Sequence, residues 1–359
     1  MIINDHVFTD FLCNLRCSYC SCDVDLMKRK GDILSIASSK YGQTNQESVI
    51  AFLQRNLEVI KLSKKKKPTP ILKISGCEIF LIPEFIEFLP SLTCEFAIIK
   101  ILTNGTLMNS QIVEQIRKFS NIHIQVSLDG HTLEMNTYRF NNYRILASIL
   151  KNIGLLYYAN IPLEINCVLT KSNIDGFFNF VFELSHIIQK CIIYPFPVRA
   201  NPELFPSNIQ IKSFEEAFKN HFTEYEHLLP PVQYFSSLIE FLKIGKRTKG
   251  CYVPHNVLAT SGDGLLDACT CGPVKTLGNV LTMNADDLYN RIEKDPCYNN
   301  VKEPTLSPIC CHDCFTQYDM INLFFEGDIS KEELGRYDFY AVPEVITLLS
   351  DIKKTIMTN

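Results

Sequence analysis

Apolar residues along the chain switch between two spacings, and the switch predicts strands separated by helices. Six short runs rich in Val, Ile and Phe have the pattern of buried strands. They span residues 6–11, 71–75, 97–103, 122–128, 163–169 and 191–196. Between them, apolar residues recur with the helical period at 49–60, 112–119, 143–158 and 177–188. Strands that alternate with helices indicate an α/β fold with a parallel sheet and right-handed crossovers.

Polar motifs occur at the ends of five predicted strands. CNLRCSYC follows the first strand, SGCE the second and TNGT the third, while SLDG ends the fourth and residues 166–169 close the fifth. In parallel sheets and barrels, reactive groups gather at the carboxyl ends of the strands. We therefore expect these motifs to share one rim, although TNGT is also compatible with a plain turn.

The pattern changes after about residue 200. Prolines punctuate the segment PFPVRANPELFP, and helical segments follow at 214–227 and 233–244. The stretch NVLATSGDGLLDAC then predicts a hairpin with Ser261 to Gly264 as its turn. The predicted organisation is a core over 1–200, a helical connection over 201–245, a cysteine-rich module over 246–330 and a helical tail over 331–359.

The composition of the chain argues against several classes of function. The 359 residues are 46% hydrophobic, enough for a large core, and the net charge of -4 offers no basic surface for nucleic acid. No stretch reaches the roughly 20 apolar residues that span a bilayer, and the polar start lacks a signal peptide. We therefore expect a cytoplasmic protein that binds neither nucleic acid nor membrane.

Fifteen cysteines are unusual for a cytoplasmic chain, where thiols stay reduced and disulfides are rare. The cysteines gather near both ends of the sequence, which favours metal or redox chemistry. The first group is Cys13, Cys17, Cys20 and Cys22; the second is Cys251, Cys269, Cys271, Cys297, Cys310, Cys311 and Cys314. The remaining four, Cys77, Cys94, Cys167 and Cys191, fit small buried apolar residues.

The thiolates of Cys13, Cys17 and Cys20 can bind three irons of a four-iron cluster and leave the fourth iron without a protein ligand. This CxxxCxxC motif after a first strand, with Tyr19 before the last cysteine, resembles the radical S-adenosylmethionine superfamily. The resemblance implies a partial (β/α)6 barrel. It also implies that the open iron binds S-adenosylmethionine, which is cleaved reductively to methionine and a 5'-deoxyadenosyl radical that abstracts a substrate hydrogen.

The resemblance also implies residues that contact S-adenosylmethionine. Gly76, Cys77 and Glu78 match the family's Gly-Gly-Glu element for the amino group, with Cys77 in place of the second glycine. Ser127 and Asp129 match the element for ribose and carboxylate. Arg139 matches an arginine that pairs with the carboxylate, although an ordinary surface charge is the alternative. Leu169 matches an adenine contact.

The second cysteine group resembles the twitch and SPASM extensions of the same superfamily. Cys251, Gly264 and Cys269 match the first half, and Cys311 and Cys314 form a CxxC pair, with Cys310 a rival for Cys311. Because no cysteine follows Cys314, the shorter twitch form fits better. Cys251, Cys269, Cys311 and Cys314 would then hold a second 4Fe-4S cluster; four cysteines also suit a structural zinc site.

Three functions remain open. Twitch and SPASM enzymes commonly modify ribosomally made peptides, so oxidation or crosslinking of a peptide is the first hypothesis. A small-molecule dehydrogenase or an epimerase is the second, and a non-catalytic iron-sulfur or zinc protein is the third. The first strand starts so early that we expect no peptide-recognition domain before it. A separate recognition protein and an electron donor such as flavodoxin or ferredoxin are the expected partners.

Overall fold

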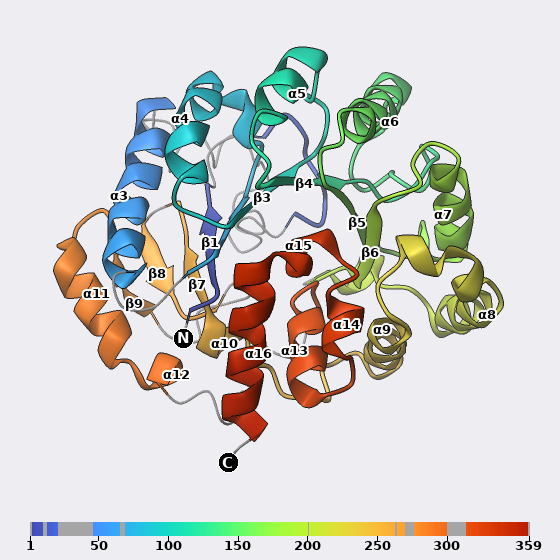
Figure 1. Cartoon of the computed structure of the whole chain (residues 1–359). Helices are drawn as coiled ribbons and strands as arrows, with labels where there is room; N and C mark the ends of the chain where they lie inside the picture. Colours follow the sequence, from blue (N-terminus) through green and yellow to red (C-terminus); the bar gives the residue numbers. More distant parts are fainter. Residues whose placement is uncertain are drawn as a thin grey trace.

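The computed structural model describes most of the chain (Figure 1). The described residues are 2–9, 13–20, 46–64, 69–199, 201–262, 264–269, 276–299 and 314–357. Cys22, Cys271, Cys310 and Cys311 lie outside these ranges, so the choice between Cys310 and Cys311 as a ligand stays a prediction.

Six parallel strands form the core of the fold. They are β1 (Asn4–Phe8), β2 (Ile71–Ser75), β3 (Ile98–Thr103), β4 (Ile122–Ser127), β5 (Leu163–Leu169) and β6 (Ile192–Pro197). Each strand pairs in parallel with the next, in the order β1 to β6. The predicted parallel sheet is confirmed. β1 begins two residues earlier than predicted, because Asn4 and Asp5 already pair with Ile71 and Leu72.

Helices cover the outer face of this curved sheet (Figure 1). The bounds are α3 (Gln46–Lys64), α4 (Pro83–Thr93), α5 (Ser110–Ile116), α6 (Tyr143–Tyr158), α7 (Phe177–Ser185), α8 (Asn208–Tyr225) and α9 (Val232–Ile244). Sequence analysis missed α4, which has a proline at its start and Pro90 in its interior. Its buried Phe85, Leu89 and Leu92 recur at helical spacing, so packing against the sheet outweighs the cost of Pro90.

The predicted hairpin extends the same sheet. β7 (Val257–Thr260) pairs in parallel with β1, and β8 (Leu265–Asp267) and β9 (Thr276–Asn279) add antiparallel strands beyond it. The sheet order is therefore β6-β5-β4-β3-β2-β1-β7-β8-β9. Gly264 closes the hairpin turn with φ +83°, where a Cβ would come within 2.7 Å of Leu281. The cysteine-rich module thus shares a continuous sheet with the core.

Shorter helices flank the hairpin: α10 (Val253–Asn256), α11 (Ala285–Lys294) and α12 (Pro296–Asn299). The C-terminal segment contains α13 (Asp319–Glu326), α14 (Lys331–Leu334), α15 (Asp338–Ala341) and α16 (Pro343–Met357). These last helices lie against the inner side of the curved sheet (Figure 1). Gln317 accepts a hydrogen bond from Gln125 of β4, and the Lys100 ammonium of β3 lies 3.6 Å from the ring centre of Phe339.

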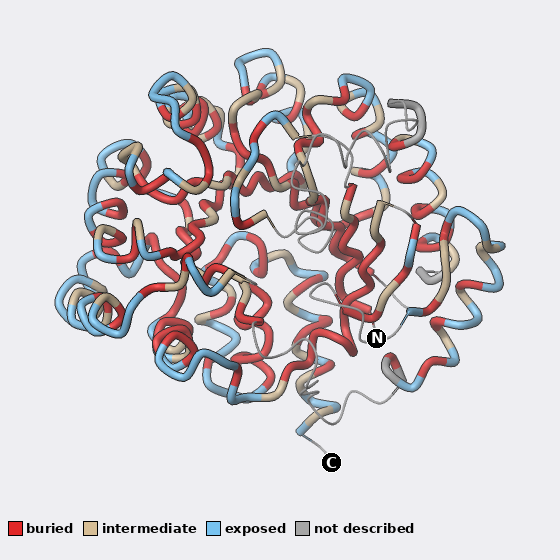
Figure 2. The backbone as a smooth tube through the Cα atoms, turned by 180° about the vertical axis from the view of Figure 1, so that it is seen from behind, coloured by how far each residue is buried: buried red, intermediate tan, exposed pale blue. Residues whose placement is uncertain are grey.

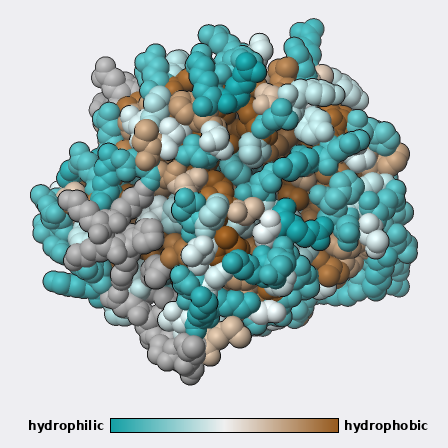
Figure 3. All heavy atoms as spheres, viewed as in Figure 1, coloured by the Kyte–Doolittle hydropathy of each residue, from teal (hydrophilic) through white to brown (hydrophobic). Residues whose placement is uncertain are grey.

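The apolar core lies between the sheet and its helices. Figure 2 shows buried backbone along the strands and exposed backbone on the outer helix faces. In the view of Figure 3, hydrophilic side chains surround apolar ones that gather between the elements. Within the described residues, no helix is both long and apolar enough to cross a membrane.

A buried polar group joins β1, α3 and β7. Asp5 is fully buried and accepts a hydrogen bond of 2.7 Å from Asn56 Nδ2, while the Asn56 Oδ1 atom accepts one from Thr260. Burial raises the pKa of Asp5 to about 7, although the bond from Asn56 favours the charged form. The Asp5 carboxyl group therefore links three segments, and the free-energy cost of burying it depends on pH.

Asp5→Asn should stabilise the protein at pH 7 and above. The folded state binds more protons than the unfolded state between about pH 4 and pH 7, so the stability of the natural protein falls as pH rises through this window. The free energy of unfolding of the variant, relative to that of the natural protein, should increase over the same pH window by at most about 4 kcal/mol and then stay constant. Urea unfolding at several pH values measures the free energy of unfolding of both proteins. Asp351→Asn, at an exposed aspartate, is the control, and its effect should not change with pH. A gain that does not change with pH would contradict the explanation.

Candidate functional site

The first cysteine motif follows β1 at the carboxyl edge of the sheet. Cys13, Cys17 and Cys20 are all partly buried free thiols. The Cys20 amide donates to the Cys17 carbonyl at 3.1 Å, and the Leu15 amide donates to Cys13 Sγ at 3.4 Å. Burial raises the pKa of both Cys13 and Cys17 to about 11, and the neighbouring thiols raise it further. The three thiols therefore stand close enough to interact, and metal binding would displace their protons.

The described residues contain no group of three His, Cys, Asp or Glu side chains arranged to hold one metal ion. Each thiolate of a four-iron cluster binds a different iron, so its ligands stand farther apart than those around a single ion.

Asp129, just after β4, organises the next part of the rim. Its Oδ2 atom accepts hydrogen bonds from the Tyr19 hydroxyl and from Arg139 Nε, and its Oδ1 atom accepts from Arg139 Nη2 at 3.0 Å and from the Val168 amide at 3.0 Å. The side chains of Asp129 and Arg139 are only 2% and 6% exposed. This carboxylate accepts four hydrogen bonds from described residues and so fixes Tyr19 and Arg139, while its predicted contact with the cofactor stays a prediction.

Arg139 is a buried residue, which contradicts the alternative of an ordinary surface charge. Two of its nitrogens bind Asp129, while Nη1 lies 4.0 Å from Cys17 Sγ. The guanidinium also stacks over the Tyr19 ring, 5.5 Å from its centre. The network therefore presents one guanidinium nitrogen beside the cysteine motif.

The SGCE motif forms a tight turn after β2. Gly76 has φ +85° and Cys77 has φ +55°, a left-handed conformation that a side chain rarely adopts. Glu78 is buried and accepts hydrogen bonds from Thr103 Oγ1 and the Asn104 amide. Burial raises the pKa of Glu78 to about 7, although the hydrogen bonds from Thr103 and Asn104 act to lower it. A cation bound beside Glu78 would favour its charged form.

The TNGT segment, for which a plain turn remained possible, belongs to the site. Thr103 and Asn104 hold Glu78, and Asn104 Nδ2 also donates to Cys13 Sγ at 3.7 Å and to Asn14 Oδ1 at 2.8 Å. Sequence analysis gave these two residues no role in the site. Their position at a strand end, like that of the other motifs, was the signal that could have found them.

Strand alternation separates Leu169 from the rim. The Leu169 side chain is fully buried in the main core, whereas Val168 packs with Tyr19 in a small apolar cluster at the rim. Alternate side chains of β5 thus face the core and the rim, and the adenine contact of Leu169 stays a prediction. Ser127 is partly buried and pairs with Asn166, whose buried Oδ1 atom accepts no hydrogen bond among the described residues. This oxygen offers an acceptor to a hydroxyl group of a ligand.

The second cysteine group lies elsewhere. Cys251 precedes α10, which sits beside the start of β1 in Figure 1. β8 runs antiparallel to β7, so Cys269, two residues after β8, lies toward the edge where β7 begins. Cys251, Cys269 and Cys314 are all buried, and the charge of Arg247 interacts with the thiols of Cys251 and Cys314. Cys251 and Cys269 thus lie near the amino ends of β1 and β7, opposite to the strand ends that carry Cys13, Cys17 and Cys20.

Comparison with known proteins gives a family match and one curated relative. Residues 11–180 match the family model of the Radical SAM superfamily. Over 167 residues the chain is 28% identical to the AdoMet-dependent heme synthase of Methanosarcina barkeri; the match covers 45% of this chain and 41% of that protein. The chain therefore matches less than half the length of this relative.

Solved structures share the fold. Streptococcus suis SuiB bound to S-adenosylmethionine superposes with a TM-score of 0.57 at 14% identity, over 90% of this chain and 72% of SuiB. Native anSMEcpe with bound AdoMet superposes with a TM-score of 0.54 at 14% identity, over 97% of this chain and 99% of that chain. The predicted fold class is confirmed, and the match to the Radical SAM family model covers residues 11–180, somewhat less than half of the chain. The twitch assignment stays a prediction.

Asp129→Ala should destabilise the protein by about 3–5 kcal/mol, because it leaves the Arg139 guanidinium buried without its counter-ion. Removing both charges in the double variant Asp129→Ala with Arg139→Met should recover much of the loss. Denaturant unfolding measures each variant. Glu114→Ala, which breaks an exposed ion pair with Arg117, is the control and should cost less than about 1 kcal/mol. Equal losses for Asp129→Ala and Glu114→Ala would show that the buried pair is not a structural requirement.

Proposed function

We propose that this chain is a radical S-adenosylmethionine enzyme, and that Cys13, Cys17 and Cys20 bind three irons of its 4Fe-4S cluster. The observation that carries the proposal is the placement of three interacting thiols beside Arg139, Glu78 and Asn104 at one strand-end rim. When bound, the cluster would supply the electron that splits S-adenosylmethionine into methionine and a 5'-deoxyadenosyl radical. The remaining task of the protein is to hold and orient the cofactor.

The rim offers a complementary group for each polar part of S-adenosylmethionine. Glu78 carries a buried carboxylate for the amino group, in a turn where Gly76 exposes backbone. Arg139 Nη1 stands free of Asp129 for the carboxylate of the cofactor. The unpaired Asn166 oxygen suits a ribose hydroxyl, and Val168 with Tyr19 suits the adenine. Asp129 acts indirectly by orienting Arg139.

The second cysteine group supports an auxiliary cluster of the twitch type. Cys251, Cys269 and Cys314 are buried on the far edge of the sheet, and Cys311 is the predicted fourth ligand. Four thiolates would close a four-iron cluster without an open site, so its expected use is to accept or relay an electron. An external donor such as flavodoxin or ferredoxin would supply the electron for the first cluster.

A ribosomally made peptide is the favoured substrate. Solved structures with the same fold include SuiB bound to the precursor peptide SuiA, and anSMEcpe with bound AdoMet and Kp18Cys peptide. Oxidation or crosslinking of such a peptide would use an auxiliary cluster as electron acceptor. A separate recognition protein would then be an additional partner.

Oxidation of a small molecule is the second candidate. The heme synthase of Methanosarcina barkeri shares 28% identity over 167 residues, and it is AdoMet-dependent by name. The two candidates require the same cofactor site and differ in what enters the open side of the barrel. They are separated by their substrates: a peptide for the first, a compound of low molecular mass for the second.

Changing Cys13, Cys17 and Cys20 together to Ala should remove about half of the iron from the reconstituted chain and all formation of 5'-deoxyadenosine, because only the second cluster retains its ligands. Iron analysis and chromatography of the cleavage products measure the two effects. Cys94→Ala, at an exposed cysteine on the outer surface, is the matched control and should change neither. Cleavage that persists in the triple variant would overturn the cluster assignment.

The mass of the product distinguishes the reactions. An oxidation should remove two hydrogens from the substrate and form 5'-deoxyadenosine in equal amount. The 5'-deoxyadenosyl radical would take the first as a hydrogen atom; the second would leave as a proton, with its electron passing to the auxiliary cluster. Mass spectrometry of candidate peptides incubated with reduced enzyme in deuterated water measures this. An unchanged hydrogen count with one deuterium incorporated at carbon would instead indicate an epimerase, which needs a thiol that returns a hydrogen atom.

A further inference from the structure

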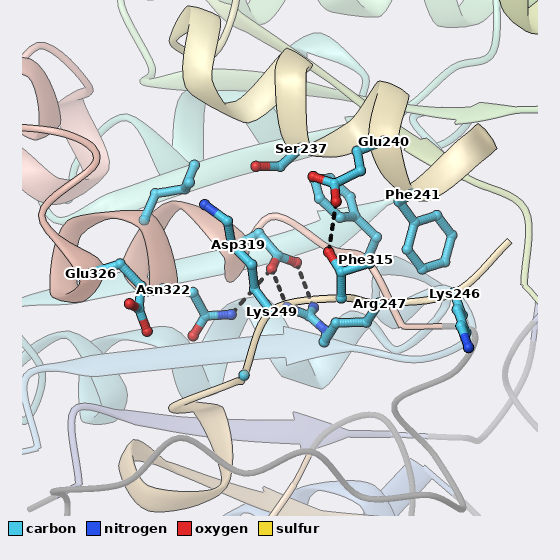
Figure 4. A pocket seen from close by; sticks show the side chains of 13 residues that line it. Ser237, Glu240, Phe241, Lys246, Arg247, Lys249, Phe315, Asp319, Asn322 and Glu326 are labelled. Carbon is cyan, nitrogen blue, oxygen red and sulfur yellow. Dashed lines mark hydrogen bonds and ion pairs between the residues drawn. The ribbon is translucent and has the colours of Figure 1, made fainter. Parts of the chain in front are cut away.

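A buried ion pair lies next to the second cysteine group. Arg247 follows α9, and its Nη1 and Nη2 atoms donate to both carboxylate oxygens of Asp319 at 2.6 and 2.9 Å. The two side chains are each 6% exposed. Figure 4 shows them at the centre of a pocket between α9 and α13, with Asn322 beside them.

The ion pair is bonded to the main chain at Cys314 and just after it. Arg247 Nε donates to the Cys314 carbonyl at 3.0 Å, and the Thr316 amide donates to Asp319 Oδ2 at 2.8 Å. These bonds hold the residues just after Cys314 against the end of α9. Since Arg247 and Cys314 are distant in sequence, the ion pair fixes where this cysteine lies.

Asn322 makes the matching connection to Cys251. Its Nδ2 atom donates to Cys251 Sγ at 3.4 Å and to Asp319 Oδ1 at 3.1 Å, and its Oδ1 atom accepts from the Tyr252 amide at 3.0 Å. Asn322 is 5% exposed. One side chain therefore fixes the backbone after Cys251 and also points an N–H group at its sulfur.

The arrangement brings positive charge to sulfur atoms. The Arg247 guanidinium is close enough to Cys251 and Cys314 for its charge to interact with both thiols. A buried ion pair is a poor source of stability, because the desolvation of both ions offsets their attraction. Hydrogen bonds and cations beside cysteine ligands stabilise additional negative charge and so tune the reduction potential of a cluster.

We propose that Asn322 and Arg247 are positioning residues for an auxiliary cluster: they fix Cys251 and Cys314 as ligands and, through the N–H···S bond and the guanidinium charge, favour the reduced state of that cluster. This inference rests on the proposed function, in which the second cysteine group binds iron and sulfide. Zinc in the same place would gain fixed ligands from these residues but would have no reduction potential to tune.

The test uses the full chain with Cys13, Cys17 and Cys20 changed to Ala, so that signals come from the second site alone. Asn322→Leu in this background removes the N–H group with little change in volume. Asn220→Leu, at an exposed position on α8, is the matched control. After reconstitution with iron and sulfide, the measurements are iron content and a potentiometric titration followed by electron paramagnetic resonance.

Asn322→Leu should shift the midpoint potential downward, so that at a fixed applied potential the ratio of reduced to oxidised cluster falls about tenfold, the effect of one lost charge-assisted hydrogen bond. Asn220→Leu should leave the titration unchanged. Arg247→Lys keeps the positive charge but loses the paired hydrogen bonds to Asp319. This variant should bind less iron, and its midpoint potential should change less than that of Asn322→Leu. It also provides the test if Asn322→Leu does not fold.

Two results would overturn the inference, and they are distinguishable. If Asn322→Leu and Arg247→Lys both keep the iron content and midpoint potential of the background, the second cluster exists and the two residues do not position it. If the background itself binds zinc or no metal after reconstitution, the auxiliary cluster of the proposed function is wrong, and the inference is lost with it.

Discussion

The parallel pairing of β1 with strands on both sides is the constraint on which the rest of the structure depends. β2 and β7 both align with Asn4 to Val7, so β1 lies inside the sheet although it opens the described chain. Polar side chains of β1 are satisfied from distant segments: Asn4 donates to the Tyr318 hydroxyl, and His6 bonds to Ser75. An interior strand needs such partners, because an unpaired buried polar group is costly. The direction of β1 also decides that its following loop, with the three cysteines, reaches the carboxyl edge.

At that edge, charge is balanced before any ligand arrives. Asp129 neutralises Arg139 and accepts hydrogen bonds from its Nε and Nη2 atoms, whereas Nη1 lies beside Cys17 instead. Glu78 differs, since only neutral donors contact it and burial raises its pKa to about 7. A ligand with a cationic and an anionic end would complete this arrangement, with the cation at Glu78 and the anion at the free nitrogen of Arg139. An amino acid group has both ends, which agrees with the methionine moiety of S-adenosylmethionine.

The sequence predicts what depends on local periodicity. All six core strands and the hairpin follow from runs of apolar residues, and Cys13, Cys17 and Cys20 follow from spacing. Helix α4 was not predicted because Pro90 in its interior argues against a helix, although Phe85, Leu89 and Leu92 recur at helical spacing and are buried. The contacts of Gln125 with Gln317 and of Lys100 with Phe339 join residues far apart in the chain, and no local pattern encodes them. The same applies to Asp129, whose type suggests a ligand contact but whose four protein donors come from three separate segments.

Cys251 and Cys269 lie at the opposite strand ends from Cys13, Cys17 and Cys20, and this placement limits what a second cluster could do. β1 has five residues, so its ends stand roughly 17 Å apart at the usual rise of a strand. Groups at opposite edges cannot bind the same substrate atom, and a contact through the sheet is blocked by the packed core. An auxiliary cluster at the Cys251 edge would therefore act by exchanging electrons, and its potential would matter more than its shape. With such a cluster in place, the hydrogen bond from Asn322 to Cys251, far from the rim, would affect the electron exchange with a cluster at Cys13, Cys17 and Cys20.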